Sequence, residues 1–358
     1  MKQNNVVLIG ADLTSNGGIA SVIKSYYESY LQGNYNYEIL LLKTNFYKDK
    51  GIFFELLILI KSIIKILYLL IFRNVGILHI HTSAHFSFYR KSIFVIIGKI
   101  FRKKLILHIH ASDFNSFFLS TNFIIDFVIK LCDYTIVLCA DWEVKLKIKY
   151  PNSKIYKIEN PFQTRMSIGS TSLKNDQFNV LFVGFLIESK GVKDIIELAK
   201  LIKNHAISDI VIKIAGKGDL EDFIKEKIID YSLEDVLKMI GWISGNNKDL
   251  AFGTANAFFL PSYKEGMPVS ILEAMSYGLP IISTQIAGIP DIVESGVNGY
   301  LFSPGDVNGF FNAILKLKQN RNLCETFFTN NINRVKSNSK EEIYKQVDNL
   351  YKELTNTD

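Results

Sequence analysis

Two glutamates, Glu265 and Glu273, stand eight positions apart in a stretch suited to binding a phosphate or a sugar. The apolar run AFFLPS precedes them, the loop KEGMP holds the first, and the apolar segment VSILEAMSYG holds the second. This order predicts a strand, a loop and a helix, with the loop at the carboxyl end of the strand, where open α/β sheets bind ligands. The loop amides and the first helical turn offer unpaired N–H groups and a positive dipole end, which favour an anion or a hydroxyl.

A lysine, Lys190, stands at a second turn of this kind. It follows the apolar run FVGFLIES and precedes a glycine and a helical segment, so its ammonium and the helix amides could meet a diphosphate. The spacing is not GxxxxGK[ST], so a P-loop is not supported. A lysine exposed to solvent is the alternative interpretation.

Two glycines, Gly17 and Gly18, mark a third junction, between the loop after VVLIG and the helical segment IASVIKSYYESYLQ. A backbone without Cβ can approach a phosphate closely at such a point. Turns need glycine for their own reasons, so the pair alone is weak evidence.

Histidines occupy alternate positions at the ends of two predicted strands: His79 and His81, then His108 and His110, with His85 beyond the first pair. Residues i and i+2 of a strand face the same side, so either pair resembles half of a metal site. No Asp, Glu or Cys lies nearby at ligand spacing, and no metal is predicted. We expect His110, next to the following loop, to donate a hydrogen bond to a substrate oxygen, and His79, His81 and His108 to be satisfied core or rim histidines.

The composition, 358 residues with 48% hydrophobic and 21% charged side chains, predicts two domains of ordinary size. The net charge of +6 comes from scattered lysines, which suits anionic substrates or membrane lipid as well as nucleic acid, and we expect no nucleic-acid partner. Three cysteines without a CxxC pair favour reduced thiols and a cytoplasmic setting. No signal peptide is predicted at the amino terminus.

Apolar strand-like runs alternate with helical segments along almost the whole chain, which predicts βαβ units and doubly wound sheets. The alternation lapses between residues 159 and 177, where Ser, Thr, Gly and Asn gather as in a linker. The last helix, from Lys340 to Leu354, is amphipathic and far in sequence from its partner surface.

The segment from Ile52 to Phe72 is long enough to span a bilayer but carries Glu55, Lys61 and Lys65. At 100° per residue its polar side chains fall on one arc, which predicts an amphipathic helix with a wide apolar face. Packing on a sheet, contact with a membrane interface and a true span are the three alternatives. The two lysines argue against the span.

The stretch LPSYKEGMPVSILEAMSYGLPIISTQIAGIPDIVESGVNGYLFSPGD resembles the E-x7-E signature of the retaining glycosyltransferases of GT-B fold, family 4 (glycosyl transferases group 1). FVGFLIESKGV, IAGKGDLE, NGGIASV, LHIHASDF and ENP stand in the order expected for that family. The resemblance implies an α/β protein of two Rossmann-like doubly wound domains facing across a cleft, with a carboxyl-terminal helix crossing back to the first. The implied boundaries are 1–165 for the acceptor domain, 166–176 for a linker, 177–336 for the nucleotide-sugar domain and 337–358 for the returning helix.

The same resemblance assigns roles to the residues of these turns. Glu273 would accept hydrogen bonds from the nucleotide ribose, Lys190 would neutralise the diphosphate, and His110 would contact the donor sugar near the reacting centre. Gly18 would let the amino-terminal loop approach the diphosphate. The donor sugar and phosphates would be held by Glu265 and the amides of its loop, namely those of Gly266, Met267 and Val269, with Pro268, which has no N–H, shaping the loop.

The implied reaction transfers a hexosyl or N-acetylhexosaminyl group from a nucleotide-sugar, a UDP-sugar for preference, with retention of anomeric configuration. The acceptor would be lipid-linked or a saccharide, in bacterial capsule or exopolysaccharide biosynthesis, on the cytoplasmic side and either free or peripheral on the membrane. No cofactor is implied, and metal independence is expected because no DxD-type motif is present. The family usually has Arg where Phe185 stands, so Lys193 or Lys217 must replace that cation or donor binding is weaker.

Two rival classes remain open. A non-catalytic accessory subunit that binds a sugar nucleotide is suggested by Phe185. A nucleotide-sugar epimerase or a dinucleotide-dependent oxidoreductase on a similar scaffold is the second, and the oxidoreductase is disfavoured because GADLTSNGG lacks the GxGxxG spacing.

Overall fold

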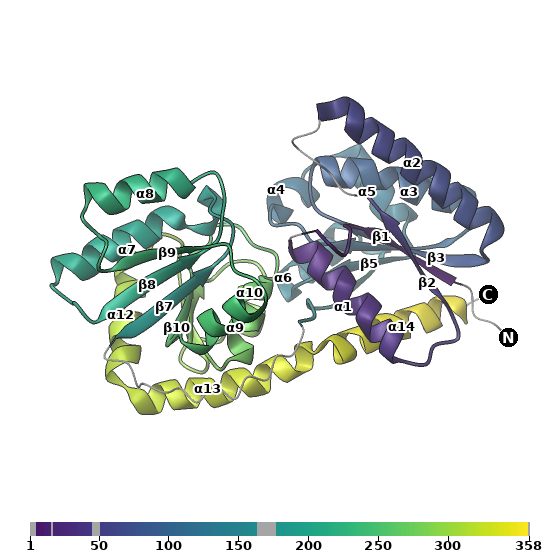
Figure 1. The fold of residues 1–358 in the computed structure, drawn as a ribbon. Helices are drawn as coiled ribbons and strands as arrows, with labels where there is room; N and C mark the ends of the chain where they lie inside the picture. The colour runs from purple at the N-terminus through teal and green to yellow at the C-terminus, as the bar shows by residue number, and fades with distance from the viewer. Residues whose placement is uncertain (1–4, 16, 45–50, 163–176, 357–358) are drawn as a thin grey trace. The chain divides into compact units, whose positions relative to one another are not determined.

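The computed structural model describes residues 5–15, 17–44, 51–162 and 177–356, with 51 and 52 described by their backbone alone. These residues form two compact units (Figure 1). The amino-terminal unit holds the described residues up to 162 and those from 338 onward, and the carboxyl-terminal unit holds 177–337. The linker expected at 166–176 lies outside the described residues.

The amino-terminal unit is built on a parallel sheet of six strands in the order β2-β1-β3-β4-β5-β6. Its central strands are short apolar runs that are buried on both faces, as parallel strands covered by helices must be. They are β1 (Asn5–Gly10), β2 (Ile39–Lys43), β3 (Val75–Thr82), β4 (Lys104–Ile109), β5 (Tyr134–Val137) and β6 (Lys154–Lys157).

Helices cover both faces of this sheet. One face carries α1 (Gly18–Gln32) and α14 (Lys340–Thr355), and the other carries α2 (Gly51–Phe72), α3 (Phe86–Ile100) and α5 (Phe123–Leu131) (Figure 1). Two further helices, α4 (Phe114–Phe118) and α6 (Ala140–Lys149), lie in the connections that follow β4 and β5.

The carboxyl-terminal helix α14 belongs to the core of the amino-terminal unit, as predicted. Tyr344, Val347 and Tyr351 pack with side chains of α1, β1 and β2 in one buried cluster. Tyr37 donates a hydrogen bond to the Asp348 carboxylate (2.7 Å) and shares a second with the Tyr344 hydroxyl (2.9 Å). Buried polar groups paired in this way fix the seat of the helix as well as its depth.

The carboxyl-terminal unit has a second six-stranded parallel sheet, in the order β12-β11-β10-β7-β8-β9. Its strands are β7 (Phe178–Val183), β8 (Ile210–Ala215), β9 (Leu237–Gly241), β10 (Ala257–Leu260), β11 (Ile281–Thr284) and β12 (Gly299–Phe302). Two doubly wound sheets were predicted, and both are confirmed.

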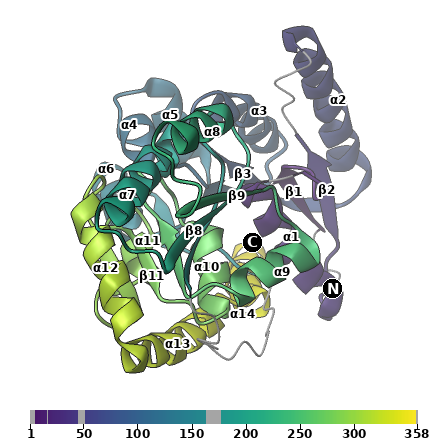
Figure 2. The ribbon, with the colours of Figure 1, turned by 60° about the vertical axis from the view of Figure 1, so that its left-hand side comes forward.

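Figure 2 shows α7 (Val192–Asn204) and α8 (Glu221–Asp230) on one side of these strands and α9 (Gly245–Gly253) and α10 (Val269–Ser276) on the other. The remaining helices are η2 (Glu188–Lys190), α11 (Ile289–Ile292), α12 (Val307–Gln319) and α13 (Arg321–Val335), with η3 (Lys336–Asn338) joining α13 to α14.

The long helix α2 forms as predicted, but its rotation differs from the simplest expectation. Its polar arc is split, because Glu55 and Ser62 are buried whereas Lys61 and Lys65 are exposed. The helix packs on the sheet through Ile66, Leu69 and Leu70, which are buried, while other large apolar side chains lie on its solvent side. Among the described residues, no helix has the length and apolar character needed to cross a membrane.

Candidate active site

The strand order of the carboxyl-terminal unit places its best ligand site between β7 and β10. These two strands are neighbours, and the chain runs outward from them in opposite directions, to β8 and β9 on one side and to β11 and β12 on the other. A reversal of this kind leaves a crevice at the carboxyl ends of the two central strands, where α/β sheets bind ligands. Lys190 follows β7, and Glu265 follows β10.

A glycine brings these two segments together. Gly191 has φ 70°, and a Cβ at this position would lie 2.0 Å from the carbonyl oxygen of Pro261. A hydrogen bond from the Tyr263 amide to the Ser189 carbonyl (2.8 Å) also joins the two segments. Only glycine combines that backbone conformation with that contact, so Gly191 sets where Lys190 lies.

Lys190 and Glu265, 75 positions apart, form a direct ion pair of 2.5 Å between Nζ and Oε1. The same carboxylate oxygen accepts a hydrogen bond from the buried hydroxyl of Ser262 (2.7 Å). Glu265 is 6% exposed, so it is held from two sides in a shielded place. In this geometry the carboxylate can orient the lysine, whose ammonium has further donors for an anion.

The loop after Glu265 leads into α10. The carbonyl of Gly266 accepts a hydrogen bond from the Gly288 amide (2.8 Å), and Met267 is buried. Pro268 precedes the helix, which begins at Val269 with no side chain capping its first turn. This arrangement leaves the amino end of α10 as a place for an anion or a hydroxyl.

The second glutamate lies on α10 and has a partner that sequence reasoning missed. Glu273 Oε1 lies 2.5 Å from Lys248 Nζ on α9. No spacing rule links these residues, because their distance depends on how α9 packs against α10. Glu265 and Glu273 therefore hold different lysines and do not form a carboxylate pair.

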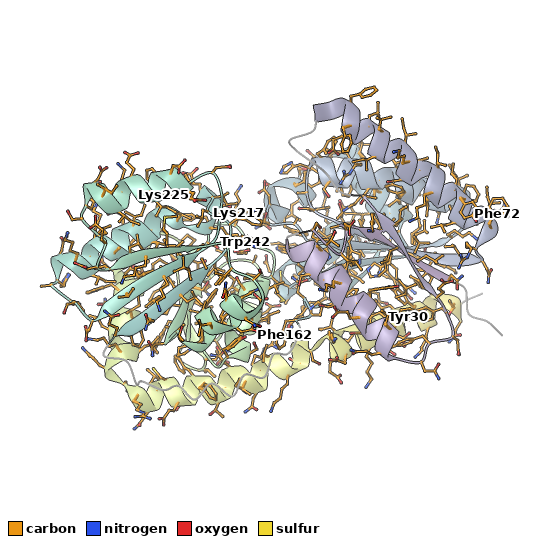
Figure 3. The ribbon with its side chains drawn as sticks, viewed as in Figure 1. Tyr30, Phe72, Phe162, Lys217, Lys225 and Trp242 are labelled. Atoms are coloured by element: carbon orange, nitrogen blue, oxygen red, sulfur yellow. The ribbon has the colours of Figure 1, made fainter. Side chains whose placement is uncertain are left out.

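Three side chains gather where β7, β8 and β9 end: Phe185, Lys217 and Trp242. The rings of Phe185 and Trp242 lie 5.7 Å apart, and Lys217 Nζ lies 5.3 Å from the Trp242 ring (Figure 3). The other lysine considered as a replacement cation, Lys193, is bound to Glu188 at 2.6 Å. Lys217, which lies at the strand ends, forms no ion pair with a carboxylate of the described residues, whereas Lys193 does.

In the amino-terminal unit, the four strand histidines form a stacked column beneath α1 and α14. His79 Nδ1 lies 2.6 Å from the Tyr351 hydroxyl, and its Nε2 lies 3.3 Å from His108 Nδ1. His81 Nδ1 lies 2.9 Å from His110 Nε2 at the open end of the column. His110 is thus positioned by His81, one strand away.

These imidazoles are neutral at physiological pH. Burial lowers the pKa of both His79 and His110 to about 3, and holds the pKa of His81 and His108 well below the usual value. Nearby Lys91 is also buried, which lowers its pKa to about 7. A neutral His110 can donate one hydrogen bond and accept another.

The expectation that the inner histidines are all satisfied is wrong for two atoms. The Nε2 atoms of His81 and His108 are buried without a hydrogen-bond partner in the described structure. Ligand nitrogens of His79, His81 and His108 lie within 4.8 Å of one another, so this trio, among the described residues, could hold a metal ion. Neutral imidazole nitrogens are suitable ligands for zinc and similar metals.

The glycine junction lies at the start of α1. Gly17 has φ 136°, a conformation that favours glycine, and a Cβ at either Gly17 or Gly18 would meet no atom within 4 Å. Gly18 and His110 are thus placed in the amino-terminal unit, and Lys190, Glu265 and Glu273 in the other.

Comparison with known proteins shows what this chain is similar to. Residues 165–334 match the family described as Glycosyl transferases group 1. The chain is 35% identical over 146 residues to the amylovoran biosynthesis glycosyltransferase AmsK of Erwinia amylovora, an alignment covering 39% of this chain and 36% of that protein. It is 34% identical over 172 residues to the UDP-Gal:alpha-D-GlcNAc-diphosphoundecaprenol alpha-1,3-galactosyltransferase of Escherichia coli, covering 46% and 44%.

The aligned part spans less than half the length of these curated relatives.

Solved structures match the whole chain. A sucrose-phosphate synthase of Thermosynechococcus elongatus has a TM-score of 0.80 at 17% identity, covering 99% of this chain and 100% of that one. Alr3699/HepE of Anabaena, solved with UDP, has a TM-score of 0.75 at 14% identity, covering 98% and 100%. The fold is therefore GT-B, as predicted.

Proposed function

We propose that this chain, a GT-B protein whose residues 165–334 match the family described as Glycosyl transferases group 1, transfers a sugar from a nucleotide-sugar to a lipid-linked or saccharide acceptor. The reaction serves bacterial cell-surface polysaccharide biosynthesis. Two relatives support this proposal by name, one in amylovoran biosynthesis and one using UDP-galactose and a diphosphoundecaprenol-linked sugar. A structural neighbour solved with UDP supports a UDP-sugar as the donor.

The observation that carries the proposal is the Lys190–Glu265 pair at the point where the strand order reverses. A cation held 2.5 Å from a carboxylate that a buried serine also binds is fixed in place before a ligand arrives. Such preorganisation makes a cation effective against charge that develops during a reaction, because little reorganisation is then needed. The charge in sugar transfer develops on the leaving diphosphate.

The proposed transfer retains anomeric configuration by displacement on one face of the sugar. The bond between the anomeric carbon and the diphosphate oxygen breaks, the acceptor oxygen bonds to that carbon on the same face, and the acceptor proton passes to the leaving diphosphate. Glu265 is already engaged by Lys190 and Ser262, which suits a positioning role rather than that of a general base. The protein then contributes orientation and charge stabilisation.

The remaining roles are assigned by position. We place the ribose at Glu273, the donor sugar and phosphates at the loop from Glu265 to Val269, and the reacting sugar near His110, with Gly18 admitting the diphosphate. Lys217 supplies the second cation in the absence of an arginine at Phe185, because Lys193 is bound to Glu188. No metal or other cofactor is required by these roles. The acceptor is reached at the cytoplasmic face of the membrane.

A matched pair of variants tests the proposal. The purified full chain is assayed for transfer from UDP-, GDP- and ADP-sugars, after a thermal-shift screen shows which of them raises the melting temperature. Lys190→Ala is expected to lower kcat/KM by about 100-fold or more, the range for losing one preorganised charge-stabilising group. Lys193→Ala removes an exposed lysine from the next turn and is expected to leave transfer unchanged. Equal activity in the two variants would overturn the assignment.

Phe185 favours a second candidate, a non-catalytic subunit that binds a sugar nucleotide. The side chain is 39% exposed at the end of β7 and carries no charge for a diphosphate. Calorimetric binding of a nucleotide-sugar without turnover on any acceptor would select this candidate. Turnover by the wild-type chain would exclude it.

A further inference from the structure

The amino-terminal unit has its own reversal of strand order, between β1 and β3. These strands are neighbours, and the chain runs outward from them to β2 on one side and to β4, β5 and β6 on the other. A reversal of this kind leaves a crevice at the carboxyl ends of the two strands. The corresponding place in the carboxyl-terminal unit holds Lys190 after β7, and here Lys91 follows β3.

Lys91 lies in the second turn of α3 and is 4% exposed. Long side chains of a helix point back toward its amino end, which here is the carboxyl end of β3. The neighbouring histidine supports this placement, because the charge of Lys91 is, after burial, the largest cause that lowers the pKa of His110. The ammonium therefore lies near the open end of the histidine column, where the strands end.

No carboxylate of the described residues balances this buried ammonium. Lys91 forms no hydrogen bond and no ion pair with them. Burial and the charge of the neighbouring Arg90 lower the pKa of Lys91 to about 7, as expected for an ammonium without a counter-charge. Arg90 itself lies 3.6 Å from the Glu55 carboxylate, so those two charges offset each other. A buried charge that is left unpaired costs free energy, and an anionic ligand would remove that cost.

The acidic side chains of the nearby loops are engaged elsewhere. Asp12, in the loop after β1, lies 2.8 Å from Lys43 Nζ. Asp113, in the loop after β4, lies 3.0 Å from His85 Nε2. Both carboxylates thus have another basic partner, and Lys91 keeps its charge for a ligand.

The first turn of α3 adds hydrogen-bond donors. The helix has 15 residues and begins after His85 with no side chain capping its first amides. Uncapped amides and the positive end of the helix dipole favour an anion. Because the Lys91 side chain points back over this turn, its ammonium and these amides can bind one phosphate group together.

The donor is a poor source for this phosphate. Its diphosphate is already assigned two cations in the carboxyl-terminal unit, Lys190 and Lys217. A further cation, in the unit that receives the acceptor, fits a second phosphate group.

We propose that Lys91 and the first turn of α3 bind a phosphate group carried by the acceptor sugar. The inference rests on the proposed function and narrows its acceptor, because a neutral saccharide would leave Lys91 without a partner. His110, near which the reacting sugar is placed, is also the neighbour of Lys91. The phosphate is therefore attached to the sugar that reacts and not to a remote part of the acceptor.

Calorimetry with inorganic pyrophosphate tests the anion site. The full chain is titrated in the Lys190→Ala background, which removes a cation of the donor site. Lys91→Met should weaken pyrophosphate binding about tenfold or more, because it replaces the ammonium by an apolar side chain of similar length. Lys99→Met, on the exposed last turn of the same helix, is the matched control and should bind as the parent does. Equal binding by the two variants, or none by the parent, would overturn the proposal.

The melting temperature without ligand shows both that the variant folds and that Lys91 has no partner within the protein. Lys91→Met should raise it, since the substitution removes a buried charge that nothing balances. A lower melting temperature would reveal a stabilising partner of Lys91 and would contradict the proposal.

Transfer kinetics identify the source of the phosphate. The two acceptors are N-acetylglucosamine 1-phosphate and the methyl glycoside of the same sugar, which is the acceptor sugar named for one relative. Lys91→Met should raise KM for the phosphate-bearing acceptor about tenfold and leave KM for the methyl glycoside and for the nucleotide-sugar unchanged. A rise in KM for the nucleotide-sugar instead would assign the anion to the donor and overturn the proposal. Absence of transfer by the wild type would count against the transferase, whereas the pyrophosphate titration decides the anion site by itself.

Discussion

The helix α7 in the carboxyl-terminal unit buries Ile195, Leu198 and Ile202 and turns Lys193 and Glu197 to solvent. The helix α2 in the amino-terminal unit differs, since it also turns the large apolar side chains Ile60 and Ile64 to solvent. Both helices cover a six-stranded parallel sheet. The same architecture therefore carries helices with different outer faces in the two units.

The strand ends differ in a parallel way. The carboxyl-terminal unit places an ion pair, Lys190 with Glu265, where its strand order reverses. The amino-terminal unit places uncharged imidazoles at its own strand ends, including His79 and His110, because burial keeps them neutral. The strand ends of the carboxyl-terminal unit thus carry a paired charge, whereas the imidazoles at the other strand ends carry none.

The largest expected effect is at the glycine that brings the ion pair together. Gly191→Ala should destabilise the carboxyl-terminal unit by about 3 kcal/mol or more, because it adds a Cβ against the Pro261 carbonyl at a positive φ. Urea unfolding monitored by Trp242 fluorescence measures the loss. Gly253→Ala, in a helix with nothing within 4 Å of the added Cβ, is the control and should change stability by no more than about 1 kcal/mol. Equal effects of the two substitutions would contradict the positioning role of Gly191.

Acid should act on the amino-terminal unit through its histidines. The pKa of His79 is about 3 in the folded chain, below its unfolded value of about 6.5, so the unfolded state binds more protons between these pH values. The stabilisation is therefore complete above about pH 6.5 and is lost as the pH falls, by about 2 kcal/mol at pH 5 for this one group.

Urea unfolding at pH 7 and pH 5 checks the acid effect, with His79→Gln as the reference variant. Glutamine keeps a hydrogen-bonding group near the Tyr351 hydroxyl but does not titrate, so the loss between the two pH values should be smaller. The same loss in wild type and variant would show that His79 is not the source.

Lys217 is the proposed replacement cation. Lys217→Ala should weaken use of the nucleotide-sugar about tenfold, mainly in KM, which corresponds to about 1.4 kcal/mol of lost charge pairing. Steady-state transfer kinetics measure it. Lys225→Ala on α8, where the lysine pairs with Glu221 at 3.0 Å (labelled in Figure 3), is the control. If only Lys225→Ala lost activity, or if neither variant did, Lys217 would not belong to the site.

The smallest expected effect comes from removing one helix cap in each unit. Asn122 caps α5 and Asn320 caps α13, each by accepting a hydrogen bond from a first-turn amide. Each Asn→Ala substitution should cost about 1 kcal/mol of stability, measured by the urea midpoint. Asn→Asp at the same positions retains the cap and should restore most of it. A cost at only one position would show that the units do not use local capping alike.

The sequence was sufficient to predict the sheets and the segments that carry the candidate site. Short apolar runs predicted the strands, and the loop positions placed Lys190 and Glu265 at strand ends. The helix α6 could not be predicted by periodicity, because Val144, Leu146 and Ile148 alternate as in a strand.

Contacts between distant segments could not be predicted from the sequence. That Lys190 bonds Glu265 directly depends on the Gly191–Pro261 approach, and that Glu273 bonds Lys248 depends on how two helices pack. The rotation of α2 was missed for the same reason, since Arg90, which lies 35 positions after Glu55, decides which side faces inward.

The return of α14 to the first sheet has a consequence for the order of events during synthesis. Proteins are made from the amino terminus, and domains usually fold in that order as they emerge from the ribosome. Here the core around Tyr26 and Tyr37 is completed by Tyr344 and Tyr351, which are translated after the whole carboxyl-terminal unit. The core of the first sheet is therefore completed only after the last helix has been synthesised. Until then, the apolar side chains that α14 covers in the folded chain lack that partner.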